Sequence, residues 1–249
     1  MLGSILMKLH YMSVNCPHRF IHFYRHDWGA QTGVFKSFQT MTDPYVSTLG
    51  VSHVSHSRSA VSLLHINHYV MHILQPEIMG VDGSGMQQSV ARTNYILEIT
   101  ALVYAVNSSG NERAAAIHDA LSIRNERREL YDTGANDNLI TLSEGTAVYT
   151  ELHMVFSRSE IDEVVKNWPL MLILQHRASQ VASLYGYMAG ALYGMLLDDF
   201  EVDWRYDIWR DTDLGLLLQE ALGITEFIPF DRIDLERYGY SVIVESALR

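Results

Sequence analysis

Three histidines recur at one-turn spacing in residues 63–76, LLHINHYVMHILQP. They are His65, His68 and His72, and the apolar run around them favours an α-helix. Because side chains three and four positions apart share a helix face, these imidazoles should lie along one stripe. Two imidazoles one turn apart can bind the same cation, and the spacing from His68 to His72 is the one used by zinc-binding helices. The stretch therefore predicts a metal site.

Two histidines do not complete such a site, because catalytic zinc takes three protein ligands and keeps an open position. The sequence offers Glu98 in the apolar segment YILEITAL and Glu144 in LSEGTAVY, each on a later predicted helix. Glu98 is also a candidate for the acceptor that orients a histidine by its other ring nitrogen, and as a buried carboxylate it needs a partner, either Arg92 or a metal. A three-histidine site that includes His65 is another possibility. The sequence does not decide which of these residues is the third ligand.

At these positions the chain resembles the gluzincin zinc metallopeptidases. His68 and His72 match the two histidines of the HExxH motif, and residues 142–149 match the EG-x-A-x-Y segment that carries the third ligand in the zinc aminopeptidases. The resemblance covers about residues 60–222. It implies a helical gluzincin-like domain, zinc as cofactor, Glu144 as the preferred third ligand, and a hydrolase that acts on a peptide or small-molecule substrate.

Tyr69 stands where HExxH has its glutamate. That glutamate accepts a proton from zinc-bound water, whereas a phenol with a pKa of about 10 does so poorly at neutral pH. Loss of a general base costs roughly 10²–10⁴-fold in rate. We therefore expect a degenerate member or one with altered chemistry, in which Glu98 or Glu151 is a candidate substitute base. The alternative is a non-catalytic binding or interaction protein that retains the helical scaffold.

Composition narrows the class of protein. The chain of 249 residues is 48% hydrophobic and 19% charged, which is typical of a globular protein with a sizeable core. A net charge of −11 disfavours a nucleic-acid partner, and no apolar run reaches the roughly 18 residues of a membrane span. Cys16 is the sole cysteine, which is compatible with a reducing compartment. We expect a cytoplasmic protein with no membrane partner.

The pattern along the chain predicts a mainly α (α+β) fold, with a small β-containing region at residues 1–57 and a helical metallopeptidase-like domain at residues 58–249. Predicted helices cover residues 58–75, 87–106, 111–131, 139–156, a short segment capped by Ser159 and ended by Trp168 and Pro169, 170–198, and 213–222. Residues 241–244, SVIV, are a candidate strand.

Two further patterns bear on packing. Gly186, Gly190 and Gly194 recur every four residues, so they form a stripe that would let another helix approach closely. The basic run RNERR, residues 124–128, is expected on a solvated helix face, paired with Glu126 and Glu129.

Overall fold

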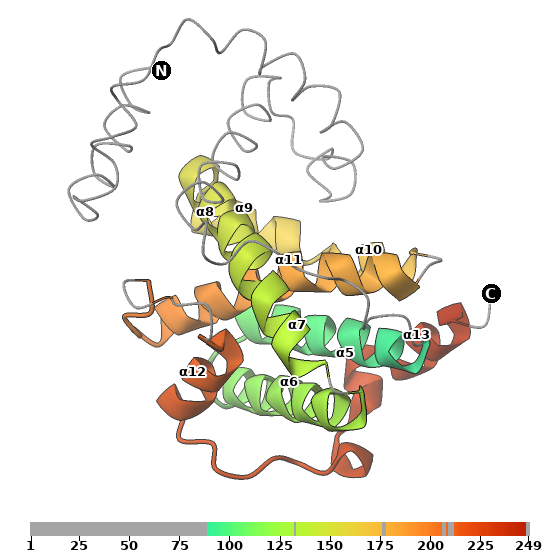
Figure 1. Ribbon diagram of the computed structural model, residues 1–249. Helices are drawn as coiled ribbons and strands as arrows, with labels where there is room; N and C mark the ends of the chain where they lie inside the picture. Colours follow the sequence, from blue (N-terminus) through green and yellow to red (C-terminus); the bar gives the residue numbers. More distant parts are fainter. Residues whose placement is uncertain (1–88, 132, 176–177, 206–207, 209–211, 248–249) are drawn as a thin grey trace, which may run out of the picture.

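The computed structural model describes residues 89–131, 133–175, 178–205, 208 and 212–247 (Figure 1). Every regular element in these residues is a helix, which confirms the mainly α class. The β-containing region expected at residues 1–57 lies outside the described residues. So does the predicted helix at residues 58–75, which carries the histidine stripe.

Helix α5 (Ser89–Val106) is the centre of the fold. It lies between α6 (Gly110–Tyr131) and α11 (Ala178–Asp199) (Figure 1). Its sequence is apolar on all sides, which is the pattern of a helix surrounded by protein, and its interior residues from Tyr95 to Leu102 are almost all buried. The predicted helices at 87–106 and 111–131 are thus confirmed over the described residues.

A long helical segment then crosses α11. It consists of α7 (Gly134–Ile140), the five-residue π-helical turn η5 (Thr141–Gly145) and α8 (Thr146–Val155), which follow one another without a break. The predicted helix at 139–156 is therefore real, but it begins earlier and contains a π-turn that no hydrophobic periodicity indicated. Figure 1 shows this segment lying across the other helices.

Two short helices follow, α9 (Arg158–Val165) and α10 (Trp168–Ile173). The expected cap at Ser159 is wrong: Ser157 caps α9, where its backbone N–H and its side chain both donate to Glu160 at 2.8 Å. The expected end of this helix before Trp168 and Pro169 is confirmed to within two residues, because α9 ends at Val165. Pro169 occupies the first turn of α10, where its missing N–H costs nothing.

The apolar stretch at residues 170–198 is divided between α10 and α11. Arg92 explains where α10 ends, because its guanidinium donates to the carbonyl oxygens of Ile173 at 3.0 Å and Gln175 at 3.2 Å. These carbonyls therefore find their partner outside the helix. Among the described residues, no helix is both long enough and apolar enough to cross a membrane.

The chain closes with α12 (Leu214–Ala221), the 3-10 turns η6 (Phe230–Arg232) and η7 (Leu235–Tyr238), and α13 (Tyr240–Ala247). The prediction at 213–222 is confirmed, with Asp213 as the N-cap. The candidate strand at 241–244 is wrong. Gly239 turns the chain with a φ of 75°, and α13 then packs on α5 through the buried Ile243. Tertiary packing outweighs the β propensity of this short segment.

Candidate functional site

The sequence-predicted site residues fall into two groups. Tyr69, His68 and His72, together with His65, lie outside the described residues. The structure does describe Glu98, Glu144 and Glu151, which come from α5, η5 and α8. The environments of these three glutamates decide what each can do.

Glu144 lies in the π-turn η5 and is partly exposed. Single π-turns inside α-helices are rare and occur frequently at functional sites. In the same turn, the hydroxyl groups of Thr141 and Ser143 are buried and have no hydrogen-bond partner within the described part of the chain. Unsatisfied buried polar groups are uncommon in folded proteins and call for an explanation. The π-turn thus combines two signs of a functional segment at the residue that the sequence singled out.

The glycine stripe fixes this turn against α11. A Cβ atom on Gly190 would lie 2.2 Å from the carbonyl oxygen of Thr141, and one on Gly145 would lie 2.5 Å from the Cα of Gly190. A Cβ atom on Gly186 would lie 1.9 Å from the side chain of Ile140. The two backbones are therefore close enough that only glycine fits. The predicted close approach of another helix to this stripe is confirmed.

The opposite side of this helix is also buried. Ala147 and Glu151 lie roughly 200° around the helix from Gly145 and Tyr149, which face α11, and both are buried. Glu144 shares their side, one turn before Ala147. Among the described helices, α11 is the main neighbour of η5 and α8, with a smaller contact from α9.

Glu98 has a different environment, because it is fully buried and its oxygens are occupied. One carboxylate oxygen accepts from Tyr185 at 2.7 Å and from Tyr193 at 2.8 Å, and the other accepts from Arg127 at 2.7 Å. Burial raises the pKa of both tyrosines well above the ordinary value, so both phenols stay protonated and donate. The partner expected for Glu98, Arg92 or a metal, is corrected to Arg127.

The basic run at residues 124–128 is not a solvated face. Arg127 is fully buried and Arg124 nearly so, and Arg127 also pairs with Asp137. Arg124 and Arg128 both reach Asp213 at 2.6 Å. Burial on its own raises the pKa of Asp213, but the two guanidinium groups outweigh it and hold the pKa well below its usual range.

Sequence reasoning missed this buried network, although one signal was present. The apolar stripe of α6 runs through Ile117, Ala120 and Ile123, all fully buried. Arg124 and Arg127 continue it at helical spacing, seven and ten positions after Ile117. Charged residues on the apolar face of a helix indicate buried ion pairs.

A third group of polar side chains lies where α8 meets the end of α11. Asp198 accepts from Tyr149, from the indole of Trp204 at 2.9 Å and from Arg205. The ring of His153 stacks on Tyr149 at 4.1 Å, and its Nδ1 lies 2.9 Å from the Tyr149 carbonyl oxygen. Burial lowers the pKa of His153, so the ring is neutral at pH 7. These contacts position α8, which is the second half of the helical segment α7–η5–α8 that crosses α11 and is called the crossing helix below.

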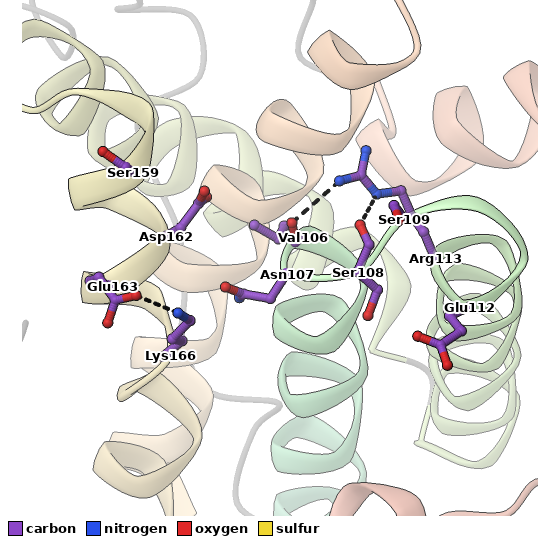
Figure 2. Close-up of a pocket in the computed structure, with 10 residues that line it drawn as sticks. All are labelled: Val106, Asn107, Ser108, Ser109, Glu112, Arg113, Ser159, Asp162, Glu163 and Lys166. Carbon is purple, nitrogen blue, oxygen red and sulfur yellow. Dashed lines mark hydrogen bonds and ion pairs between the residues drawn. The ribbon is translucent and has the colours of Figure 1, made fainter.

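A polar cleft of about 420 Å³ opens between the α5–α6 turn and one face of α9 (Figure 2). Arg113 folds back in Figure 2 to donate to the Ser108 carbonyl at 2.7 Å, and it pairs with Asp199 at 3.0 Å. Lys166 pairs with Glu163. The cationic groups of the cleft are thus occupied, and none of the three described candidates, Glu98, Glu144 and Glu151, is among the residues that line it.

No group of three or more His, Cys, Asp or Glu side chains in the described part of the chain is arranged to hold a metal ion. Neither Glu98 nor Glu144 therefore belongs to such a group within the described residues. Comparisons with protein-family models, with curated proteins and with solved structures found no match for this chain.

Proposed function

We propose that the protein is a degenerate zinc metallopeptidase-like hydrolase in which His68, His72 and Glu144 hold the metal. The observation that supports the proposal is the π-turn at Glu144, which glycine contacts fix against α11 and in which the hydroxyl groups of Thr141 and Ser143 are buried without a hydrogen-bond partner among the described residues. In this proposal, His68 and His72 bind the same ion as Glu144.

The contacts of Glu98 argue against this residue as the third ligand. A metal ligand must offer a free lone pair in the direction of the ion. Both oxygens of Glu98 already accept hydrogen bonds from Arg127, Tyr185 and Tyr193. A buried carboxylate that left this arrangement would leave Arg127 with an uncompensated charge, which is costly. Glu98 therefore fits a structural role better than that of ligand or base.

The residues present fit a zinc ion in part, because Glu144 is a partly exposed carboxylate on a helix held in a fixed position. When bound, zinc would polarise a carbonyl group and lower the pKa of a bound water. The chain's own residues would hold the ion through two imidazoles and one carboxylate. Tyr69 offers hydrogen bonding at the position of the family's base but does not accept a proton efficiently at neutral pH.

The zinc content and zinc affinity of the full-length protein test this proposal. We expect about one zinc per chain, and Glu144→Gln should weaken zinc affinity by more than the roughly 10–100-fold that loss of an outer partner costs. Glu98→Gln, confirmed as folded by circular dichroism, should retain zinc. Glu112→Gln, which changes an exposed glutamate on α6, is the matched control and should have no effect.

A second candidate, a non-catalytic binding protein, is favoured by the closed hydrogen-bond network around Glu98. This network withdraws a candidate base from chemistry, and Tyr69 removes the usual one. A folded wild-type protein that binds no zinc supports this second candidate and rules out the first. Loss of zinc in Glu98→Gln, with zinc retained in Glu144→Gln, would contradict the assignment of the third ligand.

A further inference from the structure

Arg127 joins four helices through one guanidinium group. From α6 it reaches Glu98 on α5 at 2.7 Å, Tyr185 on α11 at 2.8 Å and Asp137 on α7. The rings of Tyr95 and Tyr185 flank it, with their centroids 4.1 and 4.7 Å from its Cζ atom. No part of the side chain is exposed. Arg127 is thus the point where α7 is tied to the centre of the fold.

Asp137 is the residue of α7 on which this connection depends. Besides Arg127, it accepts from the Tyr95 hydroxyl at 3.0 Å and from the Thr133 hydroxyl at 2.8 Å. The next residue, Asn138, accepts from Arg124 at 3.0 Å. The α7 end of the crossing helix is therefore anchored to α5 and α6.

The other end is anchored to a different helix. Gly145 meets Gly190 of α11 at backbone contact distance, and Tyr149 donates to Asp198 near the end of α11. Glu144 lies between the two anchors, in the turn where the α-helical pattern changes to the π pattern. Because π-turns are rare, such a turn persists where surrounding contacts impose it.

We propose that Arg127, acting through Asp137, is a positioning residue that holds the π-turn and so fixes Glu144. The expected effect on zinc affinity rests on the proposed function. The expected effect on the π-turn rests only on the contacts of α7. Asp137 and Glu144 are seven residues apart, which is about 10 Å along the helix. Release of α7 lets the π-turn open more readily, and Glu144 then loses its fixed place.

Asp137→Asn in the full chain tests the inference, because it removes the ion pair while Arg127 keeps Glu98 as its counter-charge. Hydrogen exchange measured by mass spectrometry should rise about tenfold in residues 134–145 and stay unchanged within α11. Asp119→Asn is the matched control: Asp119 is a buried carboxylate on α6, the helix that carries Arg127, and it accepts from Tyr238 at 2.6 Å. The control should leave the exchange of residues 134–145 unchanged.

If Asp137→Asn does not fold, Thr133→Val supplies the test. It removes the hydrogen bond that Thr133 donates to Asp137 and the one that it accepts from Arg127, and it should raise the same local exchange about two- to threefold. No local rise, or an equal rise with Asp119→Asn, overturns the inference.

Zinc affinity is the second measurement on these variants. It should fall about tenfold in Asp137→Asn and stay unchanged in Asp119→Asn. Absence of zinc from the wild-type protein would overturn the proposed function alone, because the exchange measurement still decides whether Arg127 and Asp137 hold the π-turn. Unaltered zinc affinity in an Asp137→Asn variant with a loosened π-turn would overturn the positioning role.

Discussion

Glu98 and Glu144 are both glutamates on largely apolar helices, yet their surroundings give them different chemistry. Glu98 receives hydrogen bonds from Arg127, Tyr185 and Tyr193 in a site without solvent. Glu144 is partly exposed in a π-turn. A buried carboxylate surrounded by donors stabilises a fold, because its charge is compensated where it lies. The sequence places both residues on helices but does not separate these roles.

His153 gives a prediction at the level of a single residue. Burial lowers its pKa in the folded protein, whereas the unfolded chain takes up the proton near the ordinary pKa of about 6.5. Below that value the unfolded state binds more protons, so the free energy of unfolding falls as the pH falls. His153→Gln should therefore lose less stability than the wild type between pH 7 and pH 5. The difference is limited to about 1.4 kcal/mol per pH unit.

Urea unfolding at a series of pH values measures this effect, and the other histidines of the chain cancel in the comparison of variant and wild type. If the free energy of unfolding changes equally with pH in the two proteins between pH 7 and pH 5, His153 is not protected from protonation in the folded state.

At the level of elements, the contact of η5 with α11 determines where the crossing helix lies. Gly145 and Gly190 allow the two backbones to touch, and Gly186 leaves room for Ile140 at the end of α7. The Arg127–Asp137 ion pair holds α7 as well. The π-turn lies between these two restraints. A segment fixed by backbone contact and by a buried ion pair is well suited to present one side chain in a constant position.

Gly190→Ala tests the backbone contact. The new methyl group would lie 2.2 Å from the Thr141 carbonyl oxygen and 2.6 Å from the Gly145 Cα, so the helices must separate. We expect the free energy of unfolding to fall by about 3 kcal/mol. Chemical denaturation of the full chain measures the change.

Gly134→Ala is the control for this substitution, because the nearest atom to its added Cβ is 3.8 Å away. It should change the free energy of unfolding by no more than about 0.5 kcal/mol. Similar losses in the two variants would mean that α11 and η5 are not in close contact.

At the level of the whole molecule, hydrophobic periodicity was enough to predict most of the helices in the described residues. The apolar pattern of α5 and the Asp213 cap of α12 are local signals, and the structure agrees with both. The glycine spacing on α11 likewise predicted a close helix contact because four-residue periodicity marks one face.

The features that sequence reasoning missed depend on contacts between distant residues. Arg127 is buried because Glu98, twenty-nine residues earlier, supplies its counter-charge, and α13 is a helix because Ile243 packs against the body of the fold. The π-turn lies between contacts with distant parts of the chain, at Asp137 and at Gly190. Local propensity contains none of this information. The basic run at residues 124–128 was therefore assigned to a solvated surface, and the β-branched residues at 241–244 were assigned to a strand.

The proposed function requires that Glu144, His68 and His72 bind one zinc ion. X-ray absorption at the zinc edge of the purified full-length protein tests it most directly. The account predicts two imidazole nitrogens at about 2.0–2.1 Å and a carboxylate oxygen at about 2.0–2.2 Å, with the carboxylate contribution lost in Glu144→Gln. A folded protein without zinc, or a zinc environment that is unchanged by Glu144→Gln, would contradict it.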